Sequence, residues 1–152
     1  MGSKMSHGDE WIELYNNSNT DVNLNGWVLK ADDGSPKIKL SGFILSKGFY
    51  LLERTDDDSA VDVSADIIYK GSLNNKGEIL ELFNSNENLI DKVDCSKAWF
   101  AGDNKTKQTM ELSRSDLDNW QTGQDSGGTP KAKNSAGYIA SMDVEYVDVK
   151  HQ

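Results

Sequence analysis

The chain has 152 residues and carries 25 acidic against 16 basic residues, a formal net charge of −9 at pH 7. This balance excludes the basic footprint typical of nucleic-acid-binding proteins, and no apolar run approaches the roughly 20 residues that a membrane-spanning helix needs. We therefore expect neither a nucleic-acid partner nor membrane insertion.

Short apolar runs separated by Asn, Asp, Gly and Ser clusters predict about eight β-strands. In chain order the predicted strands cover residues 11–15, 22–29, 37–40, 48–53, 66–70, 78–83, 88–93 and 109–114. In the second run, Asn25 and Gly26 interrupt the alternation of side chains. This interruption predicts a β-bulge inside one strand.

The spacing of the strands predicts their packing. No stretch repeats apolar residues with the period of a helix, and short, regularly spaced strands favour an antiparallel sandwich or barrel. Alternation predicts that Leu80 and Leu82 face one side of a sheet while Glu81 and Phe83 face the other. The fold class is therefore predicted to be all-β.

An ordered set of motifs extends from residue 9 to residue 134. It comprises Glu10-Trp11-Ile12-Glu13-Leu14-Tyr15-Asn16, Leu24-Asn25-Gly26-Trp27-Val28-Leu29, residues 40–52, residues 73–82, Asp91-Lys92-Val93-Asp94, Met110-Glu111 with Arg114, Trp120, and Gly128-Thr129-Pro130. In order and spacing this set resembles the lamin-tail domain family. The resemblance implies an immunoglobulin-like antiparallel β-sandwich over residues 9–134. Four residues would form the signature of that fold: Trp11, Gly26, Trp27 and Trp120.

The resemblance also carries a functional expectation. Such domains are interaction modules and not enzymes, so it implies a non-catalytic module that presents loops and a sheet edge for protein–protein or cell-surface association. The Asn- and Ser-rich turns look like those of bacterial members, which favours a secreted or cell-surface location. The expected partner is an unidentified protein, or a second copy joined through a sheet edge.

The two ends of the chain depart from the family pattern. Family members begin with a further strand before the Glu-Trp-Ile-Glu-Leu motif, whereas residues 1–8 here are interpreted as a leader or vector-derived segment. A missing first strand would leave an unpaired sheet edge. Residues 135–152 form a C-terminal extension, and its segment 142–149 has strand chemistry. We expect this segment either to fill that edge, in the same chain or in a neighbour, or to remain a separate tail.

Few residues offer catalytic chemistry. His7 and His151 lie at opposite ends of the chain, and Cys95 is its only cysteine, so a histidine-dependent triad or a zinc site has little to build from. Cys95 follows an apolar run beside Asp94, which is typical of a structural thiol and not of a nucleophile. We predict no catalytic residue and no cofactor.

The alternative function is a carbohydrate- or calcium-dependent binding module on the same sandwich. Calcium prefers oxygen ligands from flexible acidic loops, and the candidate ligands are Asp56, Asp57, Asp58 and Asp62, with Asp32 and Asp33 as a second group. Tryptophans in a sandwich are more often core anchors than carbohydrate platforms. The better candidates for exposed recognition are therefore Trp99 and Phe100, next to Ala101-Gly102.

Overall fold

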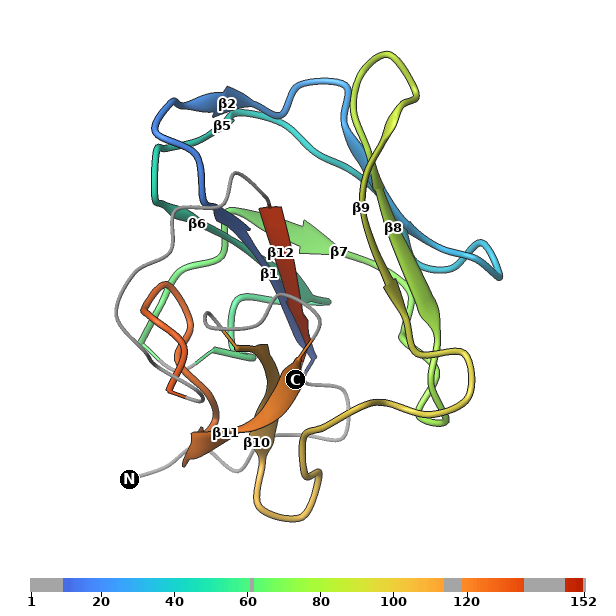
Figure 1. Cartoon of the computed structure of the whole chain (residues 1–152), viewed down its shortest axis with the longest axis vertical. Coiled ribbons are helices and arrows are strands. Elements are labelled where there is room, and N and C mark those ends of the chain that lie inside the picture. The colour runs from blue at the N-terminus through green and yellow to red at the C-terminus, as the bar shows by residue number, and fades with distance from the viewer. Residues whose placement is uncertain (1–9, 61, 114–118, 136–146, 152) are drawn as a thin grey trace.

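The computed structural model describes residues 10–60, 62–113, 119–135 and 147–151. Within these ranges the chain forms twelve β-strands and no helix (Figure 1). The strands are β1 (Trp11–Asn16), β2 (Val22–Asn23), β3 (Val28–Ala31), β4 (Lys37–Lys39), β5 (Phe43–Ile44), β6 (Phe49–Arg54), β7 (Ile67–Tyr69), β8 (Ile79–Phe83), β9 (Leu89–Asp94), β10 (Gln108–Leu112), β11 (Trp120–Ser126) and β12 (Val147–His151). The prediction of an all-β fold is confirmed, although it counted about eight strands.

The strands assemble into an immunoglobulin-like β-sandwich. One sheet has six strands in the order β11-β10-β12-β1-β6-β7, and the other has four in the order β4-β3-β8-β9. The short pair β2–β5 lies beyond them at one end, at the upper left in Figure 1. Pairing is antiparallel throughout these sheets except between β6 and β7, which are parallel.

The main core lies between the two large sheets. Its buried members include Ile12 and Leu14 of β1, Leu52 of β6, and Leu80 and Leu82 of β8. Glu81 and Phe83, which alternate with these leucines, are only partly buried. Successive side chains of a strand point to opposite faces of a sheet. The difference in burial therefore confirms the predicted orientation of this strand.

The prediction of one bulged strand over residues 22–29 is wrong. The segment forms two strands, β2 and β3, which belong to different sheets. Between them the Trp27 amide donates to the Leu24 carbonyl at 3.0 Å, and Gly26 has a φ of +81°. A glycine at positive φ closes a turn here without a steric cost to a Cβ atom, so the chain crosses from one sheet to the other.

Strand β12 lies inside the six-stranded sheet. It pairs antiparallel with β1, with Ile12 opposite His151 and Asn16 opposite Val147, and it also pairs with β10 through Met110. The backbone of residues 147–151 thus lies along the edge of β1 that a missing first strand would leave open. Of the predicted segment 142–149, residues 142–146 fall outside the described residues.

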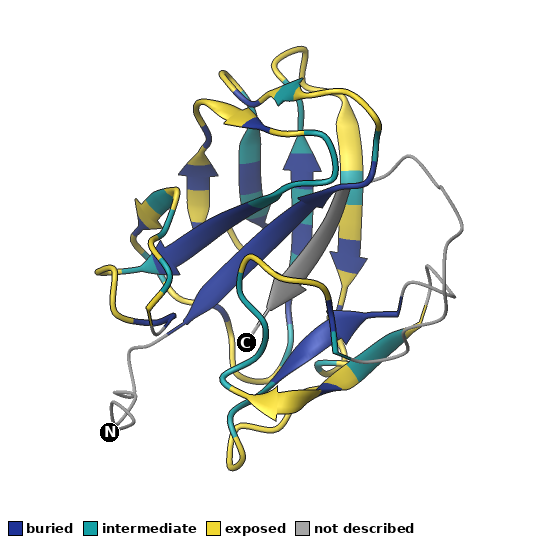
Figure 2. Cartoon of the chain, turned by 90° about the vertical axis from the view of Figure 1, so that its left-hand side faces the viewer, coloured by how far each residue is buried: buried dark blue, intermediate teal, exposed yellow. Residues whose placement is uncertain are grey.

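The outer face of the six-stranded sheet is also covered. Figure 2 shows β1 buried along its whole length, and β6 is buried over most of its length. On this face Trp11, Leu51 and Ala60 form a second, smaller buried cluster. The 127–135 segment lies over it, because a Cβ on Gly128 would come within 2.9 Å of the Trp11 ring. Strand β1 is therefore covered on both of its faces.

Candidate functional site

Three glutamates on the outer face of the six-stranded sheet are fully buried. They are Glu13, Glu53 and Glu111. The Lys131 amide donates to Glu13 Oε2, and the Ser135 amide donates to Glu111 Oε2 at 2.8 Å. Hydrogen bonds to a carboxylate are stronger than those between neutral groups. Glu13 and Glu111 therefore fasten the 127–135 segment to the sheet, whereas Glu53 accepts the Ser59 amide at 2.9 Å in the loop after β6.

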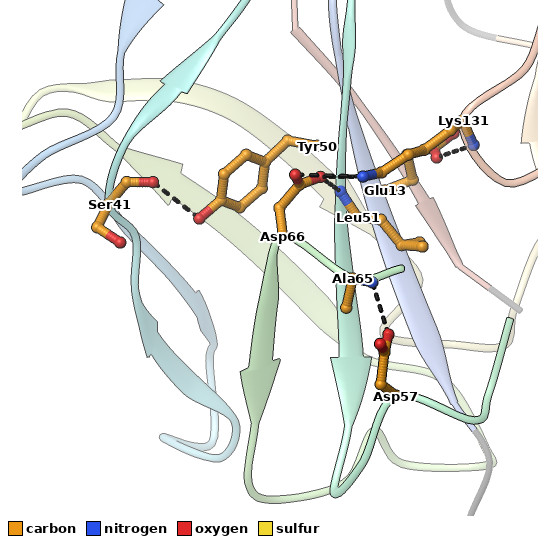
Figure 3. Close-up of polar contacts among 8 residues, drawn as sticks. All are labelled: Glu13, Ser41, Tyr50, Leu51, Asp57, Ala65, Asp66 and Lys131. Atoms are coloured by element: carbon orange, nitrogen blue, oxygen red, sulfur yellow. Dashed lines mark hydrogen bonds and ion pairs between the residues drawn. The ribbon is translucent and has the colours of Figure 1, made fainter. Parts of the chain in front are cut away.

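A second set of contacts fastens the same region from the side of β6 (Figure 3). The Lys131 ammonium lies 3.2 Å from Asp66, whose other role is to accept the Leu51 amide at 2.8 Å. The Ala65 amide donates to Asp57 Oδ1 at 2.6 Å. Each of these carboxylates is thus engaged by backbone or lysine donors that shape the loops.

The four aspartates proposed as calcium ligands lie on the loop after β6. Asp56, Asp57, Asp58 and Asp62 are all exposed. Asp56 Oδ1 accepts the Asp58 amide at 3.3 Å. Nowhere in the described ranges do three or more His, Cys, Asp or Glu side chains converge so as to hold a metal ion. Asp56 and Asp57 act here as acceptors for loop amides.

The second acidic pair, Asp32 and Asp33, lies in the turn after β3. Asp33 Oδ1 accepts the Ser35 amide at 2.9 Å, and the pair lies close to the buried Glu78. Burial, opposed by the hydrogen bond from the Asn74 amide and reinforced by the nearby Asp33 and Asp32, raises the pKa of Glu78 to about 7. This arrangement concentrates like charge and has a cost in stability.

The four tryptophans belong to the packing of the fold to different degrees. Trp11 is completely buried in the smaller cluster, while Trp27 and Trp120 are partly buried against the main core. Gly26 packs beside Ser85 of the β8–β9 hairpin. No row of exposed aromatic side chains lies on either large sheet within the described ranges, where the exposed aromatics are Phe43 and Phe100.

The two residues proposed for recognition differ in their surroundings. The Trp99 indole donates to the Asn74 carbonyl at 2.9 Å, and its ring is partly buried against the main core. Phe100 is 57% exposed. The structure thus leaves Phe100 on the surface, whereas Trp99 mostly supports the loop that follows β9.

Other exposed apolar side chains lie on β5, on the residue that follows it and at the start of β9, which belong to the upper part of the sandwich in Figure 1. We call this group the apolar end, and it consists of Phe43, Leu45, Leu89 and Ile90. Phe43 and Leu45 are 60% and 62% exposed, whereas Ile44 between them is buried. Successive side chains of a strand point to opposite faces, so three consecutive apolar residues cannot all face inward. The run Phe43-Ile44-Leu45 in the sequence could therefore have predicted exposed apolar side chains here.

Strand β9 is an edge of the four-stranded sheet and pairs with β8. The register jumps between the pairs Leu82–Asp91 and Phe83–Leu89, so Ile90 is the extra residue of a β-bulge. Asp91 faces the interior, because it lies opposite the fully buried Leu82. A bulge and an inward-pointing charge are both devices that hinder pairing with a foreign strand. Partners are therefore expected to use side chains at this edge more than its backbone.

The remaining candidates add no reactive group. Cys95 is completely buried, and burial raises the pKa of its thiol. A thiol kept protonated is a poor nucleophile, in accord with a structural role. Over the described ranges, no helix with the length and apolar character for crossing a bilayer was found.

Comparisons with known proteins bear on the whole arrangement. The family model described as Lamin Tail Domain matches residues 1–97. The match ends before β10, although β10 and β11 belong to the same sheet as β1. Searches of curated proteins and of solved structures gave no match.

Proposed function

Because this chain belongs to the lamin tail domain family, we propose that it is a non-catalytic interaction module that binds a protein partner through the apolar end. The observation that supports the proposal most is the exposure of Phe43 and Leu45 at β5 and of Leu89 and Ile90 at the start of β9. Exposed apolar side chains that gather in one place mark interaction sites, whereas single ones need no explanation.

The architecture suits this role. The β2–β3 turn packs against the β8–β9 hairpin, since a Cβ on Gly26 would lie 3.1 Å from the Ser85 Cβ. Asn25 Oδ1 in turn accepts the Gly42 amide at 3.0 Å. These contacts tie the turns that carry the apolar end to each other, so a partner meets a preorganised surface and binding costs little ordering entropy.

A photo-crosslinking experiment tests the proposal. A photoreactive amino acid at position 45 is compared with one at position 105, in a turn outside the apolar end, in extracts of the native host. We expect a saturable protein adduct from position 45 only. The double variant F43S/L45S, with the photoreactive group moved to position 89, should lose that adduct.

Two results would count against this role. Equal adducts from positions 45 and 105 would mean that the apolar end has no preference for a partner. Binding to a glycan array that persists in F43S/L45S would instead support the carbohydrate alternative. Because Phe43 and Leu45 are exposed, the double variant should keep the melting temperature of the parent, and this is checked first.

A further inference from the structure

Four of the lysines of this acidic chain lie on the outer face of the four-stranded sheet. We call them the lysine face, and they are Lys30, Lys37, Lys39 and Lys92. Strand pairing puts them there: Leu29 and Ile38 lie opposite each other in the core, so their neighbours in β3 and β4 point outward. The same alternation around buried Val93 turns Lys92 outward.

The register places these charges close together. Lys37 lies directly opposite Lys30, an arrangement of like charges that is unfavourable in a sheet. Lys30 directs its ammonium over the Phe83 ring, 4.7 Å from the centroid. Lys92 forms an ion pair with Glu81 at 3.5 Å. For Lys37 and Lys39, both exposed, the structure shows no ion pair within the described ranges.

An apolar row borders the lysines on the same face. Val28, Phe83 and Leu89 lie side by side on β3, β8 and β9, and Lys39 lies opposite Val28 at one end of the row. Leu89 is 51% exposed. The face therefore offers two exposed lysines, Lys37 and Lys39, beside an apolar row whose most exposed member is Leu89.

We propose that the lysine face binds an acidic polypeptide segment, with carboxylates on Lys37 and Lys39 and an apolar side chain over Phe83 and Leu89. The inference deepens the proposed interaction role, on a surface that adjoins the apolar end at Leu89. Charge complementarity selects the sign of the partner. A nucleic acid fits less well, because its phosphates would leave the apolar row uncovered.

Lysines on edge strands also prevent unwanted pairing between sheets, and β4 is an edge. The two roles make different demands on charge. Protection of an edge needs a charge of either sign, whereas recognition of an acidic segment needs a positive one. Replacing Lys37 and Lys39 by glutamate therefore separates them: protection survives and binding is lost.

The experiment measures fluorescence anisotropy of a labelled, capped peptide of alternating Glu and Leu residues, at low and at physiological salt. We expect the parent protein to bind it, and the matching Gln–Leu peptide to bind at least about tenfold more weakly. K37E/K39E should weaken binding at least about tenfold, as expected when attraction turns to repulsion. The control K76E/K105E makes the same change in net charge at exposed turn lysines and should bind like the parent.

Three results of this experiment would overturn the proposal, and one further variant serves as a control. Equal binding by K37E/K39E and the parent, or no binding at low salt, would overturn the proposal. So would duplex DNA or anionic vesicles that compete for the same lysines more strongly than the peptide. F43S/L45S should bind the peptide like the parent, which separates a failure here from a failure of the apolar end.

Discussion

At the scale of single residues, Asp91 shows how the fold treats a charge that faces inward. Burial raises the pKa of its carboxyl group to about 6, and the hydrogen bond from the Lys92 amide only partly opposes this effect. The folded state therefore holds a proton more tightly than the unfolded chain. The contribution of Asp91 to stability is therefore most favourable below the pKa of this group in the unfolded chain, and it is lost as the pH rises through about 6.

Replacing Asp91 by asparagine removes the charge and keeps the shape. We expect D91N to raise the free energy of unfolding near neutral pH by about 1–2 kcal/mol, since each pKa unit corresponds to about 1.4 kcal/mol. Urea denaturation of both proteins across the acidic range measures it. D94N is the matched control: the Ser96 hydroxyl and amide lower the pKa of exposed Asp94, so this variant should gain nothing. A loss of stability in D91N would contradict the expectation.

Two glycines at positive φ make a second pair of variants. Gly77 has a φ of +120°, and an added Cβ would overlap the Cys95 carbonyl and lie 2.9 Å from the Ala98 Cα. Gly34 has a φ of +92° with open space around it. We expect G34A to cost about 1 kcal/mol from backbone strain, and G77A about 3 kcal/mol or more because backbone must also move. Thermal denaturation compares them; equal costs would mean that the Gly77 turn yields easily.

At the scale of elements, β12 has the largest structural consequence. Its five residues pair with β1 on one side and with β10 on the other. A chain that ends at Ser135 would lose this ladder, and we expect its unfolding free energy to fall by about 3–5 kcal/mol, at roughly 1 kcal/mol per hydrogen bond. The exposed β1 edge should also promote self-association.

Light scattering after size-exclusion chromatography, together with urea denaturation, measures both effects of the truncation. Ending the chain after Ser135 keeps the contacts of this residue with Glu111. The truncated chain therefore keeps these contacts of the 127–135 segment with the sheet. A monomer with the stability of the full chain would show that β12 contributes little.

Elements also show what sequence patterns predict and what they miss. Strand β8 was predictable because Leu80 and Leu82 alternate with Glu81 and Phe83 along a half-buried surface. Strand β11 was not, because its glycine and polar side chains are typical of a loop. Its Gly123 lies over the buried carboxylate of Glu111, only 2.6 Å from where a Cβ would be. A glycine that leaves space for a neighbouring side chain interrupts the alternation of apolar and polar residues by which a strand is predicted.

The candidate surfaces were harder to predict than the fold. Trp99 and Phe100 look alike in sequence, but only the indole finds a backbone carbonyl and the main core to pack against. The lysine face joins residues from β3, β4 and β9, whose registers are set by tertiary pairing and not by local pattern. Sequence therefore indicates the scaffold, while the positions of its surface groups depend on how the strands pair.

At the scale of the whole molecule, the buried acids act together. Burial raises the pKa values of Glu53, Glu78 and Asp91, so each carboxyl group binds protons more tightly in the folded state. Repulsion within a chain of net charge −9 acts in the same direction. We expect the unfolding free energy to increase by about 1–3 kcal/mol from about pH 8 to about pH 5. Urea midpoints over this range measure it; constant or decreasing stability would contradict it.

The place of β12 in the sheet has a consequence for biosynthesis. The ribosome makes this strand after the other eleven, yet it occupies an interior position between β1 and β10. A nascent chain can therefore pair β8 with β9 early, but β10 and β11 cannot join β1 until residues 147–151 have emerged. Pairing of segments so distant in sequence is slow and leaves an open strand in the meantime. During that interval, a chaperone that shields β1 would favour correct folding over association between nascent chains.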